Sequence, residues 1–268
     1  MSNTSGMIHL SAFDLSLAAL LVVALALSSV RIYPGLARQL LIAALRTAIQ
    51  LTLVGLVLKV LFANSDLLWV TLISLAMLFV AGREVMARQH RRFAGRWGYS
   101  IGVISMFVSS FAVTLFALLV VVGNEPWYQP QYAIPLLGML LGNTMTSISL
   151  ALDRLTQSAW EQRAVIEARL VLGHSAQEAI SDIQRQVFRS GLIPIINAMA
   201  AAGIVSLPGM MTGQILAGAE PVEAVKYQIL IMFLITGGAG FGTMAAVHLA
   251  VHRLFDERQR LRLDRLKR

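Results

Sequence analysis

The sequence predicts an all-α polytopic membrane protein with about seven transmembrane helices. The first observation is composition: of the 268 residues, 57% are hydrophobic and only 13% are charged, whereas a soluble domain carries about 25% charged residues. The second is a mean hydropathy of +0.70. The third is spacing, because the charge-free intervals approach the ~20 apolar residues that a helix needs to cross a bilayer. Residues 1–268 are therefore predicted to form one transmembrane domain.

Seven apolar intervals are the candidate spans. The first and third are slightly short, and the second contains one arginine, Arg46. The intervals are 15–30, 39–58, 67–82, 97–124, 126–152, 190–219 and 227–252. Residues 24–29 have the small side chains of a signal-peptide cleavage site. A signal peptide requires basic residues before its apolar region, and no Lys or Arg precedes Arg31. We therefore expect the first interval to remain a span.

Basic residues are distributed unequally between the loops. Five arginines lie between the third and fourth spans, and the tail from Arg253 carries seven Lys or Arg residues. The alternate loops are acidic or neutral. Short cytoplasmic loops carry the excess of Lys and Arg, so the N-terminus is predicted outside and the C-terminus in the cytoplasm. The net charge of +8 is then explained by the loops, and no nucleic-acid partner is expected.

The longest polar stretch is 153–190, which is predicted to form a cytoplasmic helix–turn–helix. Helix-forming residues fill 154–172, and Gly173 suits the position just past a helix end. Ser175 followed by Glu178 is a capping box that begins a second helix, expected to run to about Arg189. The elbow would expose Leu170, Val171 and Leu172. Exposed apolar residues rimmed by charge suggest a partner site, although a solvated connector is the alternative.

A broken helix or outer re-entrant element is predicted at 204–224. Pro208 and Gly209 interrupt an interval too long for one span. We expect a span to about Val205, a break, and a short outer helix to Gly218, with Pro221 in the first turn of the next helix. Irregular backbone at membrane depth survives only where protein or a water-filled cavity covers it, so the break predicts a gate or substrate site.

Polar residues within spans are functional candidates because they are expensive in a bilayer. Arg46 could instead snorkel, and the asparagines could form interhelical hydrogen bonds. Methionines near the break could bind Cu(I) but are also common packing residues, so no metal ligand is assigned. The predicted substrate path comprises Arg46, Gln50, Asn143, Asn197, Pro208, Gly209, Met210 and Met211, with Glu220 and Glu223 as possible outer acids.

Catalytic signatures are missing from the sequence. There is no cysteine, no HExxH, no GxSxG and no GxxxxGK[ST]. The chain is therefore not expected to be an enzyme or to bind a cofactor. If ATP and Mg²⁺ drive it, they bind to a partner subunit.

Four segments resemble known permeases. Glu167-Ala168-Arg169, three residues and Gly173 resemble the EAA loop of ABC-transporter permeases, with Ile183 at that pattern's Ile and Arg185 and Gln186 in place of its Leu-Pro. The other segments resemble motifs of the FetB-type permease family, and the similarity extends over roughly 15–255. These segments are 46–51, 135–143 and 206–228.

The resemblance implies a permease of a bacterial ABC exporter linked to iron efflux, working as a homodimer in the cytoplasmic membrane with a separate ATPase subunit. A related plant permease is tied to aluminium tolerance. Coupling to the ATPase would fall on Glu167, Ala168, Arg169, Leu172, Gly173 and His174. The alternative is an ATPase-independent secondary transporter or channel for a metal ion, which would need intramembrane acids that the spans lack.

Overall fold

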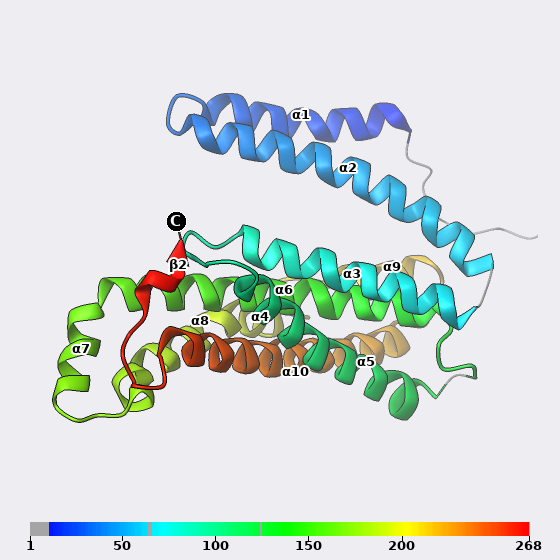
Figure 1. Ribbon diagram of the computed structural model, residues 1–268. Coiled ribbons are helices and arrows are strands. Elements are labelled where there is room, and N and C mark those ends of the chain that lie inside the picture. Colours follow the sequence, from blue (N-terminus) through cyan, green and yellow to red (C-terminus); the bar gives the residue numbers. More distant parts are fainter. Residues whose placement is uncertain (1–10, 64–65, 124, 268) are drawn as a thin grey trace, which may run out of the picture. The chain divides into compact units, whose positions relative to one another are not determined.

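The chain is almost entirely helical in a computed structural model that describes residues 11–63, 66–123 and 125–267 (Figure 1). The helices are α1 (Ala12–Ser29), α2 (Pro34–Ala63), α3 (Leu67–Ala87), α4 (Trp97–Met106), the π-helix η1 (Phe107–Phe111), α5 (Ala112–Phe116), the π-helix η2 (Ala117–Val122), α6 (Pro130–Glu161), α7 (Arg163–Val171), α8 (Ala176–Ala201), α9 (Gly209–Leu216), α10 (Pro221–Leu254) and the 3₁₀ turn η3 (Leu263–Arg265). Two short strands, β1 (Arg92–Phe93) and β2 (Leu266–Lys267), complete the described elements.

Six helical segments in the described ranges are long and apolar enough to cross a membrane. They are Ala12–Ser29, Gly35–Lys59, Leu67–Ala87, Trp97–Val122, Pro130–Glu161 and Pro221–Leu254. The prediction of an all-α polytopic membrane protein is confirmed, and six of the seven predicted intervals overlap these segments.

The seventh interval, 190–219, is divided between α8 and α9. α8 runs between the same two ends of the bundle as α6 and α10 (Figure 1). Its first half is too polar for the hydropathy of a typical span, because it contains Glu178, Asp182, Arg185 and Arg189. The total of seven spans and the N-terminus-out orientation therefore stay predictions.

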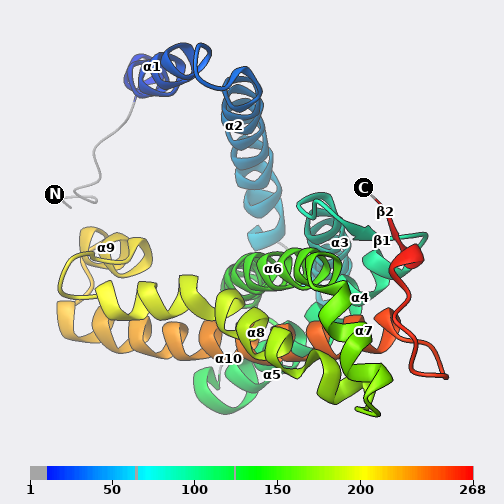
Figure 2. The same ribbon diagram turned by 90° about the vertical axis from the view of Figure 1, so that its left-hand side faces the viewer.

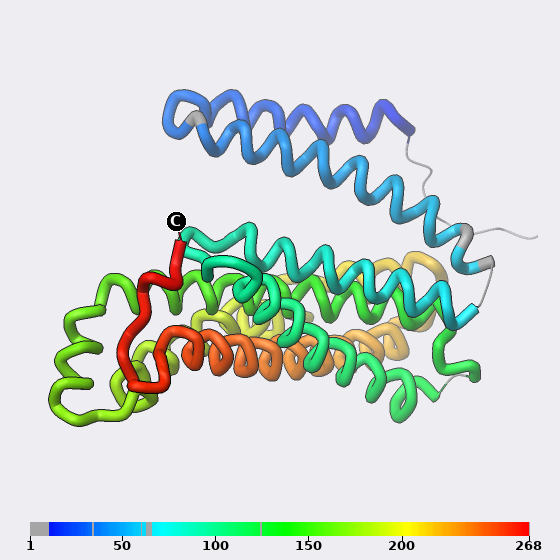
Figure 3. The backbone as a smooth tube through the Cα atoms, in the orientation of Figure 1, coloured from blue at the N-terminus to red at the C-terminus, as the bar shows by residue number. Residues whose placement is uncertain are grey.

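The chain forms two compact units. The first contains α1, α2 and residues 213–219. The second contains α3 to α8, residues 209–212, α10 and the C-terminal tail. Within the first unit, α1 and α2 lie side by side and antiparallel (Figure 3). α1 begins at a capping box in which the Ser11 N–H donates to the Asp14 carboxylate at 2.8 Å.

α6 is the central helix of the second unit and contacts α3, α8 and α10. α3, α6 and α10 run in one direction, and the α4–η2 segment and α8 run in the other (Figures 1 and 2). One end of this unit gathers the loop 88–96, the turn between α7 and α8, and the tail 255–267; we call it the elbow end. The opposite end holds the starts of α3, α6 and α10 and the end of α8.

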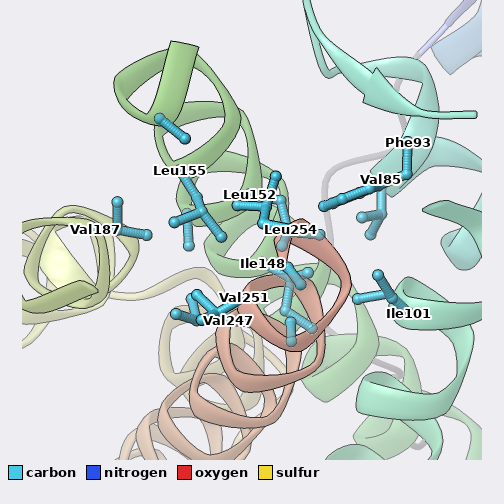
Figure 4. Packing of buried hydrophobic residues seen from close by; sticks show 14 of the residues in the cluster. Val85, Phe93, Ile101, Ile148, Leu152, Leu155, Val187, Val247, Val251 and Leu254 are labelled. Atoms are coloured by element: carbon cyan, nitrogen blue, oxygen red, sulfur yellow. The ribbon is translucent and has the colours of Figure 1, made fainter. Parts of the chain in front are cut away.

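The buried core lies between α6, α10, α8 and the α3–α4 hairpin (Figure 4). Ile148, Leu152 and Leu155 of α6 are fully buried against Val251 and Leu254 of α10. Two close approaches depend on glycine. A Cβ on Gly191 would lie 3.0 Å from the Ser147 carbonyl oxygen, and a Cβ on Gly242 would lie 2.6 Å from Thr144 Cγ2. α8 and α10 therefore pack on α6 at a distance that only a missing side chain allows.

The tail folds back onto the elbow end. β2 pairs antiparallel with β1, with Arg92 opposite Lys267 and Phe93 opposite Leu266. The same loop is tied to α6, because the His90 N–H donates to the Asp153 carboxylate at 2.7 Å. The elbow end is thus assembled from segments far apart in the sequence.

Three predicted boundaries are wrong. The second helix of the 153–190 segment does not end near Arg189 but continues as α8 to Ala201, since the change from polar to apolar side chains does not interrupt its backbone hydrogen bonds. The next break therefore comes earlier than Val205: Ala202 is extended and Gly203 has φ +79°. The first helix, expected over 154–172, is interrupted at Gln162, which has φ −100° and ψ 20°.

Candidate coupling site

The turn between α7 and α8 is a glycine-terminated helix end. The Gly173 N–H donates to the Leu170 carbonyl and the His174 N–H to the Arg169 carbonyl, each at 3.1 Å. This pair of bonds is the Schellman motif, which requires a left-handed residue at the turn. Gly173 supplies it with φ +92°, as the sequence predicted. α7 therefore ends at a defined point and the chain reverses within a few residues.

The start of α8 is fixed by the predicted capping box. The Glu178 N–H donates to Ser175 Oγ at 3.3 Å, and the Ser175 N–H donates to Glu178 Oε2 at 2.8 Å. The bonds from the backbone and hydroxyl of Ser175 hold the pKa of Glu178 below its ordinary value. The carboxylate is ionised at neutral pH and compensates the unpaired N–H groups of the first turn.

Arg169 braces α7 against α8. Its Nη2 lies 2.8 Å from Asp182 Oδ2, and its Nη1 donates to the Ala179 carbonyl at 3.3 Å. The predicted coupling residue thus has an internal partner on the following helix. Its role in the structure is to fix the angle of the elbow.

The tail closes one side of the elbow. Gln259 Oε1 accepts a hydrogen bond from the Ala176 N–H at 2.8 Å, which satisfies another donor of the first turn of α8. A cavity of about 830 Å³ lies between the elbow residues Glu167, Gly173 and His174 and the tail residues 257–261. The coupling residues predicted from the sequence are therefore partly enclosed by a segment that was not predicted to be near them.

The tail loop is itself ordered by one carboxylate. Asp256 accepts hydrogen bonds from the Arg260 N–H at 2.9 Å and the Arg258 N–H at 3.0 Å, and it lies 2.8 Å from the Arg260 guanidinium. These bonds, led by the one from the Arg260 backbone, lower the pKa of Asp256 to about 2. The loop keeps this charge throughout the physiological range.

The tip of the elbow is apolar and exposed. Val171 is 88% exposed and Leu172 is 78% exposed. The prediction for Leu170 was wrong, because its side chain packs against the core that surrounds Ile166. The apolar tip of the elbow therefore consists of two adjacent, strongly exposed side chains.

The predicted substrate-path residues are divided between the two compact units. Arg46 and Gln50 lie on α2, in the first unit. Asn143 and Asn197 are exposed on α6 and α8, and Asn143 Nδ2 donates to the Met139 carbonyl of its own helix at 2.8 Å. Among the hydrogen bonds of the described residues none joins the two asparagines, and a path shared by their side chains stays a prediction.

The residues of the break have different environments. Pro208 precedes α9, whose first three residues are Gly209, Met210 and Met211; Met211 is buried. Glu220 precedes α10 and is exposed, and Glu223 Oε1 lies 2.6 Å from Lys226 Nζ. Pro221 occupies the first turn of α10, as predicted. Within the described ranges, no group of three or more His, Asp or Glu side chains is arranged to hold a metal ion.

Sequence reasoning missed Asp182, Gln259 and Asp256 as parts of the elbow. Asp182 lies one turn beyond Glu178, and its spacing from Arg169 could have indicated the ion pair once the turn was placed. Gln259 carried no local signal, since its partner is 83 positions away in the chain.

Comparison with known proteins identifies a family and several relatives. The model of an uncharacterised protein family, UPF0014, matches residues 12–255. A UPF0014 membrane protein of Synechocystis is 41% identical over 233 residues, which is 85% of this chain and 87% of that protein. The Escherichia coli protein named probable iron export permease protein FetB is 33% identical over 261 residues, 95% of this chain and 96% of that protein. The Arabidopsis protein ALUMINUM SENSITIVE 3 is 32% identical over 216 residues, which is 81% of this chain and 77% of that protein. No solved structure matches the chain.

Proposed function

Because the chain belongs to the UPF0014 family of membrane proteins, we propose that it is the permease subunit of an ATP-driven exporter energised by a separate ABC ATPase. It is a multi-pass protein of the bacterial cytoplasmic membrane. The observation that carries the proposal is the exposed apolar pair Val171 and Leu172 at the tip of a braced elbow. Such a tip fits an apolar groove on a soluble partner.

The elbow end faces the cytoplasm in this proposal. The loop 88–96 contains Arg88, Arg91, Arg92 and Arg96, and the tail adds further arginines. Positive loops stay on the cytoplasmic side, where a soluble ATPase would meet the elbow. The orientation of the whole chain follows from this placement.

A push on the elbow would be transmitted by α8. The helix begins at the capping box and continues without interruption to Ala201. Arg169 and Asp182 tie it to α7, and Gly191 brings it into contact with Ser147 of α6. Packed interiors shift between discrete arrangements rather than deforming continuously, so a displacement at Gly173 would alter packing within the bundle.

The exposed positions of Asn143 and Asn197 support the proposal that a second copy of the chain binds to this one. α8 runs antiparallel to α6, and Gly191 lies against Ser147. Asn143 is four residues from that contact and Asn197 six, so at a rise of about 1.5 Å per residue both lie roughly 6–9 Å to the same side of it. The two amides therefore lie at a similar depth in the membrane, where exposing a polar side chain to lipid costs free energy. We propose that a homodimer interface or the substrate path covers them.

Iron is the proposed cargo, and this rests on the name of the Escherichia coli relative. Hard cations prefer oxygen ligands, which the amide oxygens of Asn143 and Asn197 would supply. Glu220 remains a candidate outer acid, whereas Glu223 is engaged by Lys226.

The ATPase partnership is tested with variants of the elbow tip and a matched variant on α7. Leu172→Asp puts a charge at the tip, and Val165→Asp introduces the same charge at a residue of α7 that is 52% exposed. Co-expression with a candidate ABC ATPase subunit from the same organism, followed by affinity purification, measures association. Leu172→Asp and Gly173→Trp should lose the ATPase, and Val165→Asp should retain it.

Transport is measured in inverted vesicles, with ATP and radioactive iron added to the outside medium, which contacts the cytoplasmic face of the protein. Wild-type vesicles should accumulate iron only with the ATPase and ATP present. Association unchanged in both Leu172→Asp and Gly173→Trp would remove the coupling role of the elbow. Iron transport by the permease alone would replace the proposal with a secondary transporter or channel.

A further inference from the structure

A second cavity at the elbow end is rich in basic groups. It has a volume of about 900 Å³ and lies between the end of α10, Trp97 at the start of α4, the start of α8 and the tail. Its basic lining groups are His248, His252, Arg253, Arg258, Arg260 and Arg265. The acidic lining groups are Asp256 and Glu257, so the arginines outnumber the carboxylates by four to two.

The arginines of this cavity are not equally compensated. Arg260 is paired with Asp256, and Arg265 Nη1 donates to the carbonyls of Arg253 and Phe255 at 2.8 and 3.2 Å. Arg253 instead stacks on the Trp97 ring, with Cζ 4.6 Å from the ring centroid. In the part of the chain that the structure describes, no carboxylate oxygen lies within 4.0 Å of the guanidinium nitrogens of Arg253 or Arg258. Neither of these two cations therefore forms an ion pair with a carboxylate of the described residues.

The cavity lies at the level where two spans end. Trp97 is the first residue of one candidate span, and Arg253 is in the last turn of another. Trp rings and basic side chains are typical of the interface between hydrocarbon and headgroups. An anion that binds Arg253 would therefore lie at headgroup depth.

An apolar groove adjoins the cavity on the side away from the tail. It has a volume of about 260 Å³ and is lined by Phe188, Met244 and Val247, with Gln184, Arg185 and His248 at its polar margin. His248 lines both spaces. On α10, Met244 of the groove lies one turn before His248, where the cavity begins. On the antiparallel helix α8, the groove residues come after the cavity residues Ala176 and Gln177. The groove therefore extends from the cavity toward the middle of the bundle.

We propose that the cavity and groove together bind one anionic phospholipid, with its phosphate between Arg253 and Arg258 and an acyl chain along Phe188 and Met244. The excess positive charge selects an anionic headgroup over a zwitterionic one. The groove selects a lipid over a soluble phosphate, because a soluble anion gains nothing from an apolar surface. The bound headgroup would join α10, α4 and the tail loop that contacts the elbow through Gln259.

The site is tested on the isolated permease, so the result does not depend on the ATPase partnership. The protein is reconstituted with equal amounts of dioleoyl phosphatidylglycerol and dioleoyl phosphatidylcholine, and retained lipid is measured by native mass spectrometry. The test variant is Arg253→Gln/Arg258→Gln. The matched control, Arg88→Gln/Arg92→Gln, removes two exposed arginines at the same end that line neither space.

The wild-type protein and the control should retain phosphatidylglycerol in preference to phosphatidylcholine. The test variant should weaken that retention by about thirtyfold, as expected for two arginines near an anionic surface. Equal retention of the two lipids, or unchanged retention in the test variant, would overturn the proposal.

Two further measurements separate other occupants. Glycerol 1-phosphate carries the headgroup without acyl chains and should displace the lipid only at far higher concentration. Displacement at equal concentration would show a site for soluble anions and overturn the lipid assignment. A Met244→Cys variant should remain uncross-linked in the membrane. A disulfide between two copies would show that a second chain covers the groove, which would also overturn the proposal.

Discussion

The two ends of the helical bundle are stabilised in different ways. At the elbow end, side chains connect separate segments of the chain, as in the Gln259 bond to the Ala176 N–H and the Arg169 pair with Asp182. At the opposite end, segment 202–208 is held largely by local backbone bonds, with the Val205 and Ser206 N–H groups donating to the Ala201 carbonyl at 2.9 and 3.1 Å. Ile204 and Val205 are 87% and 82% exposed.

The difference in internal support indicates that the two ends make different kinds of contact with other chains. The elbow end is self-supporting and exposes only a small apolar tip, which suits a relay that docks and releases a soluble partner. Segment 202–208 exposes a larger fraction of its apolar side chains and has little internal support. Irregular backbone near a membrane must be covered by protein or line a cavity, so in the proposed homodimer we expect this segment to contact the second copy.

The largest expected effect comes from placing one charge at each end. Ile204→Asp and Val171→Asp alter side chains of nearly equal exposure, 87% and 88%. If segment 202–208 is covered in a dimer, Ile204→Asp buries an unpaired carboxylate and should weaken dimerisation by about 2–5 kcal/mol. Val171→Asp should leave the dimer intact and abolish association with the ATPase.

Dimerisation is measured by single-molecule photobleaching in lipid vesicles, and ATPase association by affinity purification. Each variant serves as the control for the other. The comparison between the ends fails if both variants lose the same partner, or if Ile204→Asp remains as dimeric as the wild type.

A smaller effect is expected from the core that joins the two ends. In Gly242→Ala the new Cβ would lie 2.6 Å from Thr144 Cγ2 and 2.7 Å from Ser109 Oγ, whereas a Cβ at Gly240 meets nothing within 4 Å. Overpacking should destabilise Gly242→Ala by about 1–3 kcal/mol. Gly240→Ala, on the same helix, should be neutral or more stable by up to about 1 kcal/mol because alanine favours helix.

Thermal unfolding in detergent, followed by size-exclusion chromatography, measures both glycine variants. A lower melting temperature for Gly242→Ala alone supports a tightly packed connection between the ends. Equal melting temperatures would mean that α6 and α10 can separate at this level without cost.

The local parts of the elbow could be predicted from the sequence, because their causes are local. Ser175 and Glu178 are three residues apart, and Gly173 suits the left-handed turn because it has no Cβ. The interruption at Gln162 could not be predicted, since helix-forming residues surround it and tertiary packing decides where α6 ends. The extent of α8 was underestimated because the transition from charged to apolar residues was taken for a helix end.

The long-range parts of the site could not be predicted either. Gln259 and Asp256 are ordinary polar residues in a basic tail, and only the return of β2 to β1 brings them to the elbow. Membrane character, by contrast, depends on composition over whole spans, which is why it was predicted correctly while individual contacts were not.

The smallest expected effect is a response to acid at one end only. The pKa of Asp256 is lowered from 3.8 to about 2. Its ionised form therefore stabilises the tail loop above about pH 4, and that contribution is lost as the pH falls through about 2. Segment 202–208 contains no titratable side chain, so its local stability should not change over the same range.

Hydrogen exchange with mass spectrometry, corrected for the intrinsic effect of pH, measures this response in peptides covering 256–262 and 202–208. Exchange in the tail should accelerate between about pH 4 and pH 2 while exchange in 202–208 stays constant. At neutral pH, Asp256→Asn should accelerate exchange in the tail, and Glu257→Gln, which alters an exposed neighbour, should not. Parallel acceleration in both peptides would mean that acid loosens the whole bundle, and that the elbow end owes its order to the core rather than to its own side-chain bonds.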